Sequence, residues 1–473
     1  MCWILSKLMS PSLILFSNFN VELLLKWNKW FFRFWCCCDQ LEIILGFSSS
    51  ILLLAFFLLS SCALLDDEDE NILPGKRESV YDSEEKLILK ANKRIELEKP
   101  KIISNWSQQH QNLKNHLFHF NSNSTLRFEK RIKLGDINLD KIQYITPPII
   151  SENTIFYSDN DFNIVSKNLK TGKLNWNIKL EFEKDENFSL VSGFFLDNNT
   201  LFFSTGLGNI YSVDAANGKI KWLKKFGIQF SRPPVINKDK LFLVSDDNQL
   251  YAINKTNGDV MWSHLGNIEE LSIIGGSKPA VDEGIIVVSY SSGEIFALNE
   301  NNGSIIWFDN ISTTNFFSKT NINDIQSPIC IEKGKLFVPT FSNKLLTYDL
   351  KTGKKSWDIR LSSISPMVIS GETMYVIDIN GKLMSIDKVS GKLLWAVQLR
   401  SKKGDSEINW SGPLLSSYKL LVVSSEGNVL SLSPFTGKTL SNIKFKESFI
   451  SEPIQVNKKI YLISKEGSLY ILS

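Results

Sequence analysis

The sequence predicts an all-β fold, an eight-bladed β-propeller with four-stranded antiparallel blades that is closed by an N-terminal strand. The first observation behind this prediction is an internal Gly-x-x-x-Trp repeat, spaced 38 to 50 residues apart. The second is that short apolar runs alternate with turns rich in Asn, Asp and Gly, which is typical of strands and not of helices. The repeated tryptophans are Trp176, Trp222, Trp262, Trp307, Trp357 and Trp395, and a seventh copy carries Ser441 instead.

Each repeat contains four β-rich runs, which is the content of one propeller blade. The hairpin that ends at Gly353 needs a residue with positive φ, and glycine adopts that conformation without strain. The Trp that follows is wide enough to fill the gap between neighbouring sheets. Because the same residue recurs at one repeat position, we predict that it packs between blades and does not stack on a ligand.

Eight units fill the chain from about residue 146 to Ser473, but the last one ends after three strands. Residues 130–134 repeat the pattern of a final strand, with Lys130 at the Trp position. We therefore expect the segment around residues 126–134 to complete the eighth blade and residues 126–473 to form the propeller. Closure of this kind removes exposed sheet edges. The units begin near Pro147, Ser192, Pro233, Pro279, Pro328, Pro366, Pro413 and Pro453.

Composition excludes some functions. The chain has 473 residues and a net charge of +3, which gives no electrostatic case for binding nucleic acid. Of the six cysteines, only Cys330 lies beyond residue 62, so the propeller has no internal disulfide framework.

The N-terminal region is predicted to be a targeting signal. Residues 1–61 are predicted to be a lead and a lipoprotein signal, because an apolar run over residues 43–59 ends in Ser60, Ser61 and Cys62. These residues resemble the bacterial lipobox, which implies acylation of Cys62 and a firm membrane anchor. The alternative is an uncleaved membrane helix that ends at this cysteine. Ala63 points to the outer membrane, and residues 62–125 are expected to form a lipidated tether.

The segment from Leu250 to Trp262 resembles the pyrroloquinoline-quinone-type propeller repeat. Together with the lipobox, residues 62–473 resemble the BamB family of outer-membrane assembly lipoproteins. The resemblance implies a non-catalytic scaffold without a cofactor, held at the periplasmic face of the outer membrane. It also implies binding to a POTRA domain of a BamA-like barrel insertase, as one copy within a complex.

The resemblance further implies two partner-binding loops. One matches residues 271–275 and contributes Leu271, Ile273 and Ile274, where Ile274 replaces an Arg of the family. The other contributes Asn323 and Asp324. The apolar residues of the first loop are either partner contacts, since exposed apolar clusters usually mark an interface, or an ordinary buried strand start.

Two rival functions remain. Quinoprotein dehydrogenases share the repeat, but they use a Ca²⁺ site, an Asp base and a disulfide between adjacent cysteines, and Cys330 is alone in the propeller. We predict no catalytic residue and no metal site, because His116 and His119 lack the further ligands that structural zinc needs. The other rival is a propeller lipoprotein that binds a different periplasmic protein or a small ligand in its channel.

Overall fold

A computed structural model describes residues 93–473 except residue 124, residues 136–145, residue 160, residues 181–190, 269–274, 312–326 and 341–342, residue 401, residues 404–405 and residue 450. The chain divides into two units, Met1–Glu84 and Glu85–Ser473, and all described residues belong to the second. Cys62 and the predicted signal therefore lie outside the described residues. No helix within the described part is long and apolar enough to cross a membrane.

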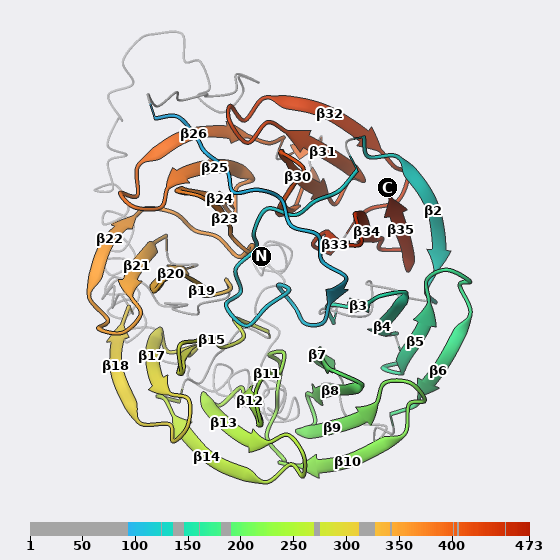
Figure 1. Ribbon diagram of the computed structural model, residues 1–473, viewed down its shortest axis with the longest axis vertical. Helices are drawn as coiled ribbons and strands as arrows, with labels where there is room; N and C mark the ends of the chain where they lie inside the picture. The colour runs from blue at the N-terminus through green and yellow to red at the C-terminus, as the bar shows by residue number, and fades with distance from the viewer. Residues whose placement is uncertain are drawn as a thin grey trace, which may run out of the picture. The chain divides into compact units, whose positions relative to one another are not determined.

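Eight antiparallel sheets follow one another around a ring, which confirms the predicted eight-bladed propeller (Figure 1). Blades one and two comprise β3 (Ile149–Ser151), β4 (Thr154–Ser158), β5 (Ile164–Asn168) and β6 (Leu174–Ile178), then β7 (Val191–Asp197), β8 (Thr200–Thr205), β9 (Asn209–Asp214) and β10 (Ile220–Lys225). Blades three and four comprise β11 (Val235–Asn237), β12 (Lys240–Val244), β13 (Gln249–Asn254) and β14 (Val260–Leu265), then β15 (Ala280–Asp282), β16 (Ile285–Ser289), β17 (Glu294–Asn299) and β18 (Ile305–Asn310).

The remaining blades repeat the same order. Blades five and six comprise β19 (Cys330–Glu332), β20 (Lys335–Pro339), β21 (Leu345–Asp349) and β22 (Lys355–Ile359), then β23 (Val368–Ser370), β24 (Thr373–Ile377), β25 (Lys382–Asp387) and β26 (Leu393–Gln398). A two-stranded hairpin of β27 (Lys402–Lys403) and β28 (Ser406–Glu407) follows. Blades seven and eight comprise β29 (Trp410–Ser416), β30 (Lys419–Ser424), β31 (Asn428–Leu432) and β32 (Thr439–Lys444), then β33 (Ile454–Val456), β34 (Lys459–Ile463), β35 (Ser468–Leu472) and β2 (Phe128–Lys133).

The two faces of the ring carry different connections. Because successive strands are antiparallel, every link from an outer strand to the next inner strand emerges on one face, which we call the link face. The turns between first and second strands, such as that at Gly334, emerge on the opposite face.

The eighth blade closes as the sequence predicts. Strand β2 pairs antiparallel with β35, so Phe128 lies opposite Leu472 and Lys133 opposite Ser468. Arg127 and Ser473 exchange two backbone hydrogen bonds of 2.9 Å beyond the end of this ladder. The two ends of the propeller are therefore joined within one sheet.

Each repeat Trp lies against the glycine turn of the next blade, as predicted. A Cβ added to Gly353 would come within 2.7 Å of the Trp307 ring, and Trp307 Nε1 donates to Leu350 O at 2.8 Å. The same two contacts are made by Trp176, Trp222, Trp357 and Trp395. Trp262 lies against Gly303 in the same way, but its Nε1 has no hydrogen-bond partner among the described residues. The wide ring thus fits only because the facing residue has no side chain.

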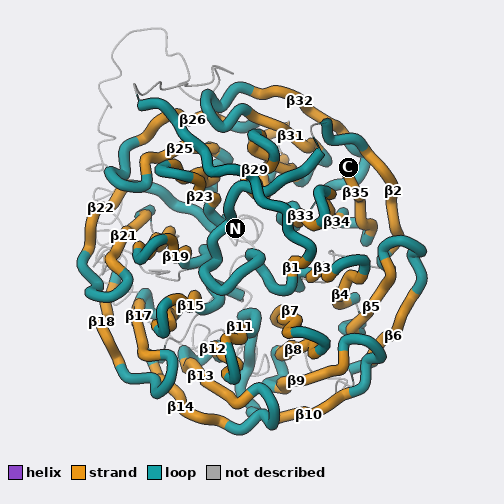
Figure 2. The backbone as a smooth tube through the Cα atoms, viewed as in Figure 1, coloured by secondary structure: helices purple, strands orange, loops and turns teal. Residues whose placement is uncertain are grey.

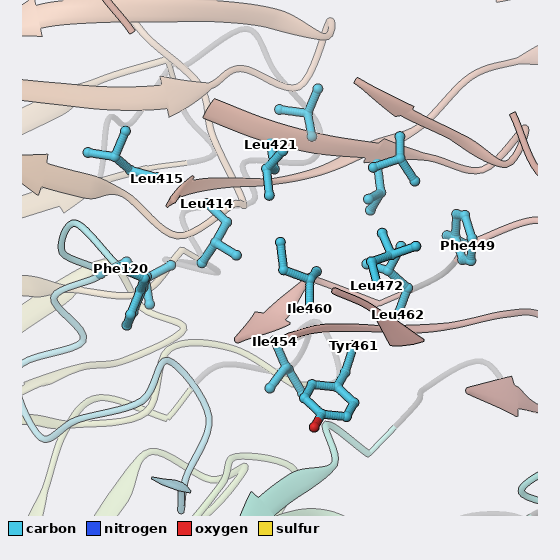
Figure 3. Packing of buried hydrophobic residues seen from close by; sticks show 14 of the residues in the cluster. Phe120, Leu414, Leu415, Leu421, Phe449, Ile454, Ile460, Tyr461, Leu462 and Leu472 are labelled. Carbon is cyan, nitrogen blue, oxygen red and sulfur yellow. The ribbon is translucent and has the colours of Figure 1, made fainter. Parts of the chain in front are cut away.

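The core fills the space between successive sheets. Its largest cluster runs through blades six, seven, eight and one and includes Phe120 of the N-terminal chain. Figure 3 shows Leu414 and Leu421 of blade seven facing Ile460 of blade eight, with Phe120 beside them. Burial of this kind contributes roughly 25 cal/mol per Å² of apolar surface, and the contribution recurs at each blade junction.

The sequence predicts a tether over residues 62–125, but residues 101–122 of that range run around the ring alongside the inner strands (Figure 2). We call these residues the axial segment. Its strand β1 (Asn105–Trp106) pairs with β3. Further backbone hydrogen bonds of 2.8–2.9 Å join it to blades two, four, five, six, seven and eight. The segment closes on itself, because Lys101 N donates to His119 O at 2.8 Å. The inner edges of the blades thus satisfy its backbone polar groups, which a free tether would leave to water.

We expect Gly353→Ala to destabilise the propeller more than Gly334→Ala. Both glycines have positive φ, +68° and +71°, so each substitution carries a left-handed strain of roughly 1 kcal/mol. Only the Cβ at residue 353 would meet a ring, since nothing lies within 4 Å of that position at Gly334. Overpacking typically costs a further 1–3 kcal/mol. Denaturant unfolding of both variants measures the difference, and equal midpoints would contradict the role of the Trp–Gly contact.

Candidate functional site

The residues predicted to contact a partner, Leu271, Ile273, Ile274, Asn323 and Asp324, lie outside the described residues. Their role stays a prediction. The structure does describe the chain on both sides of these segments. The first segment links β14 to β15 and the second links β18 to β19. The described ends of both links therefore lie on the link face, in neighbouring positions around the ring.

The start of the first link is fixed at Asn267. Its backbone N–H donates to Glu294 Oε2 at 2.8 Å, and its Nδ2 donates to Glu294 Oε1 at 2.6 Å. Its carbonyl accepts a bond of 2.6 Å from Asn248 Nδ2. Glu294 is buried, and Ser292 Oγ also donates to it at 2.8 Å. Bonds to a carboxylate are stronger than neutral ones, so this clamp holds the next residue, Ile268, at the surface with 70% of its area exposed.

The end of the first link is fixed at Gly275. Its N–H donates to Ser231 Oγ at 3.0 Å, and its carbonyl accepts from Arg232 Nε at 3.3 Å. The guanidinium is buried and also donates from Nη1 to Ser289 O at 2.6 Å. Gly276 has a φ of +114°, and a Cβ there would lie 3.0 Å from Arg232 Nε. Position 276 therefore favours glycine, because its φ is positive and the Arg232 side chain lies against its Cα.

A carboxyl group completes this anchor. Ser231 Oγ donates to Asp246 Oδ1 at 2.5 Å. Burial raises the pKa of Asp246 above its usual value, while the hydrogen bonds from Ser231 and the charge of Arg232 oppose that rise. The Asp246 carboxyl group is therefore stabilised by the Ser231 hydroxyl, which donates to it, and by the positive charge of Arg232. It helps to hold the residues that fix the end of the first link.

The bases of the two links are bonded to each other. We define the link bases as residues 275–278 and residues 327–329. Ser277 Oγ accepts a hydrogen bond of 3.1 Å from the N–H of Ile329. Ser327 Oγ bonds the carbonyl of Ser363, which anchors the second base toward blade six. The chain therefore enters β15 and β19 from positions held a fixed distance apart.

The His, Cys, Asp and Glu side chains of the described residues bear on whether the ring could act as an enzyme. No group of three or more His, Cys, Asp or Glu side chains there could hold a metal ion. Burial raises the pKa of the Cys330 thiol, so the reactive thiolate is disfavoured. His116 Nε2 lies 3.1 Å from Ile369 O and His119 Nδ1 lies 2.6 Å from Glu98 O, so each ring is held by a different backbone carbonyl.

One surface cavity of about 230 Å³ lies between blades one and two. Its lining includes Glu152 and Asn198, which occupy turns on the face opposite the links. The cavity is therefore separate from the link bases.

The sequence reasoning missed the residues that fix the links. A signal for Glu294 was present: it is the only acid at its repeat position, where other blades have Asn209, Gln249, Lys344, Lys382, Asn428 and Ser468. The position is half-buried or exposed in most blades, but Glu294 itself is buried, and a buried charge needs a specific partner. The partner itself, Asn267, gave no comparable signal.

Comparison with known proteins places this ring in a family. Residues 160–397 and 380–473 match the family described as outer membrane protein assembly factor BamB. The chain belongs to this family. BamB of Yersinia pestis is 21% identical over 239 residues, which make up 50% of this chain and 60% of that protein. The chain spans less than two thirds of the length of the curated relatives that it matches.

Solved structures share the fold. The crystal structure of BamB from Moraxella catarrhalis is similar with a TM-score of 0.60 and 17% identity, over 74% of this chain and all of that one. Quinohemoprotein alcohol dehydrogenase from Comamonas testosteroni is similar with a TM-score of 0.61 and 12% identity, over 78% of this chain and 80% of that one. At such identities the likeness concerns the fold alone, and function must be argued from the site.

We expect Glu294→Ala to release the start of the first link. Loss of the carboxylate leaves the Asn267 amide without its acceptor, so hydrogen exchange there should speed up at least about tenfold, as expected for a bond worth about 1.5 kcal/mol or more. Glu300→Ala is the control. Glu300 is also a buried acid of blade four, but it accepts from Asn237 Nδ2 at 2.7 Å. Unchanged protection of Asn267 in the first variant would contradict the clamp.

Proposed function

We propose that this chain is a non-catalytic scaffold lipoprotein of the outer-membrane β-barrel assembly machinery. It binds a POTRA domain of a BamA-like insertase through the two links that precede β15 and β19. Acyl chains on Cys62 hold it in the inner leaflet of the outer membrane, on the periplasmic side. The match of residues 160–397 and 380–473 to the BamB family carries the proposal.

The arrangement of the link bases supports the same function. A binding surface made of links gains affinity when the links start from fixed positions, because less conformational entropy is lost on association. Glu294 fixes one end of the first link and Arg232 the other, while Ser277 joins both link bases. Contact residues on loops that a rigid frame positions are a common arrangement in binding proteins.

The described residues do not fit the quinone and calcium pair of the dehydrogenases that share this fold. Those enzymes, as the resemblance implies, use carboxylates around a metal ion and a disulfide between adjacent cysteines. Within the described ranges no acidic or histidine cluster of that kind occurs, and Cys330 is buried alone in β19. We therefore propose no step through a quinone.

We predict that Ile273→Asp weakens binding to the isolated POTRA domains of the insertase by about 30-fold or more. A charge at an apolar anchor must be desolvated, and loss of such an anchor typically costs about 2 kcal/mol. The double variant Leu271→Ala with Ile273→Ala should have a similar effect, and Asp324→Ala a smaller one. Calorimetry measures the affinity, and circular dichroism checks the fold of each variant.

Ile379→Asp is the matched control for this experiment. Ile379 lies in the turn between β24 and β25 of blade six, on the link face, and 46% of its surface is exposed. The substitution should leave the affinity unchanged. A folded Ile273→Asp protein with full affinity would refute the site, and failure of the unmodified protein to bind would favour a different periplasmic partner.

We predict that Cys62→Ser abolishes acylation and releases the protein from membranes, because the thiol is the acyl acceptor. Labelling with radioactive palmitate and fractionation of cells measure both effects. Cys36→Ser changes a cysteine in the lead, outside the lipobox, and should leave both unchanged. Continued labelling of the Cys62→Ser protein would exclude the lipoprotein reading.

A further inference from the structure

One side chain of the axial segment touches both link bases. Asn115 is fully buried, and its Nδ2 donates to Ile329 O at 2.9 Å and, less closely, to Lys278 O at 3.4 Å. Lys278 lies just before β15, and Ile329 lies directly before β19. Asn115 has a φ of +52°, a conformation that Asn tolerates better than most residues. The segment is thus bent at the point where its amide reaches both carbonyls.

The first link base returns this contact. The side chain of Lys278 is 1% exposed, and its Nζ donates to Gln108 Oε1 at 2.6 Å and to Asn112 O at 3.1 Å. Both acceptors are neutral oxygens of the axial segment. Burial lowers the pKa of this ammonium well below its usual range. A buried ammonium is stable only while its oxygens stay in place, so the link base and the segment hold each other.

These hydrogen bonds connect the axial segment and the two link bases to one another. Asn115 joins the axial segment to both bases, Lys278 joins the first base back to the segment, and Ser277 Oγ accepts from Ile329 N between the bases. We call these residues, with Ile329, the axial bracket. Any displacement of the axial segment at Asn115 must break a bond to a residue that immediately precedes β15 or β19.

The chain just before the axial segment is also attached to the propeller. Glu98 N donates to Ser370 Oγ at 2.9 Å, and Lys333 Nζ pairs with Glu98 Oε1 at 3.2 Å. Lys93 forms an ion pair with Asp387. Lys93 and Glu98 belong to the predicted tether and lie between Cys62 and the axial segment in the sequence. The chain is therefore attached to blades five and six before it enters the axial segment.

We propose that Asn115 and Lys278 are positioning residues for partner binding, and that the axial segment is part of the binding apparatus. By holding the two link bases, the bracket sets the spacing from which both links present their contacts. Without it, binding would have to order the bases as well, and affinity would fall. The identity of the partner rests on the proposed function, whereas the positioning of the bases does not.

The test compares Asn115→Ala and Asn105→Ala in the full-length protein. Asn105 also belongs to the axial segment, but its Oδ1 accepts from Ser151 Oγ at 3.1 Å and Glu152 N at 3.2 Å in blade one. Hydrogen exchange is followed in peptides over residues 275–281 and 327–332. Affinity for the insertase POTRA domains is measured well below the unfolding temperature, where a merely structural defect would not alter it.

We expect Asn115→Ala to speed exchange in both peptides at least tenfold and to raise Kd about tenfold, with Asn105→Ala unchanged in both. Lys278→Met provides a second variant. It replaces a buried ammonium with an apolar chain, a change that proteins often tolerate, and it removes the bonds to Gln108 and Asn112. It should give the same two effects.

Three results would overturn the proposal. These are unchanged exchange in a folded Asn115→Ala protein, faster exchange with unaltered Kd, or an equal response of Asn105→Ala. If the unmodified protein does not bind POTRA domains, the proposed function fails. In that case the exchange measurements alone decide whether the bracket positions the link bases.

Discussion

The propeller depends on the contact between a Trp ring of one blade and the glycine turn of the next. Trp307 rests on Gly353 and donates its indole N–H to Leu350 O, three residues earlier in the same turn. The ring needs a turn without a side chain, and the turn's carbonyl needs a donor. Each requirement is met by the neighbouring blade, so the sequence of one blade determines how the next blade packs against it. A sequence that keeps both residues in step therefore builds a ring, because successive pairs share a blade.

One exception is Trp262, which lies against Gly303 while its buried Nε1 has no hydrogen-bond partner within the described part of the chain. Two others occur where the ring is joined. Lys130 has the Trp position on β2, and its Nζ donates to Leu169 O at 2.6 Å, the carbonyl that an indole would otherwise bond. Ser441 has the Trp position on β32, and it is exposed. It faces blade eight, whose third and fourth strands are joined by pairing and not by a turn. With no glycine turn to cover, a large ring there would have no partner.

The fold could be predicted from the sequence because the repeat is local. The course of the axial segment and the hydrogen bonds that fix the links could not be predicted. The repeat places its Gly and Trp a few residues apart, so spacing alone reveals it. The bonds of Asn115 reach Lys278 and Ile329 across 163 and 214 positions, and no short pattern encodes such pairs. The axial segment does not form one long strand, because its backbone hydrogen bonds go to seven different blades. It therefore lacks the alternating polarity by which a strand is recognised in a sequence. The prediction that Leu271 and Asp324 contact a partner rests on resemblance and not on physical reasoning.

Buried charged groups occur on both faces of the ring. Arg232, Lys278 and Glu294 lie where the first link begins and ends, whereas Glu300, Glu332 and Lys388 lie at strand ends on the opposite face. Blade junctions use apolar packing, which tolerates exchange of similar side chains. The two ends of the first link are instead held by Glu294, Arg232 and Lys278, whose burial is unfavourable unless every partner is in place. Such groups add little net stability but permit only one arrangement of the chain. At the first link these groups bond the chain on both sides of the connection from β14 to β15. Their hydrogen bonds therefore specify the geometry with which the chain leaves blade three and enters blade four.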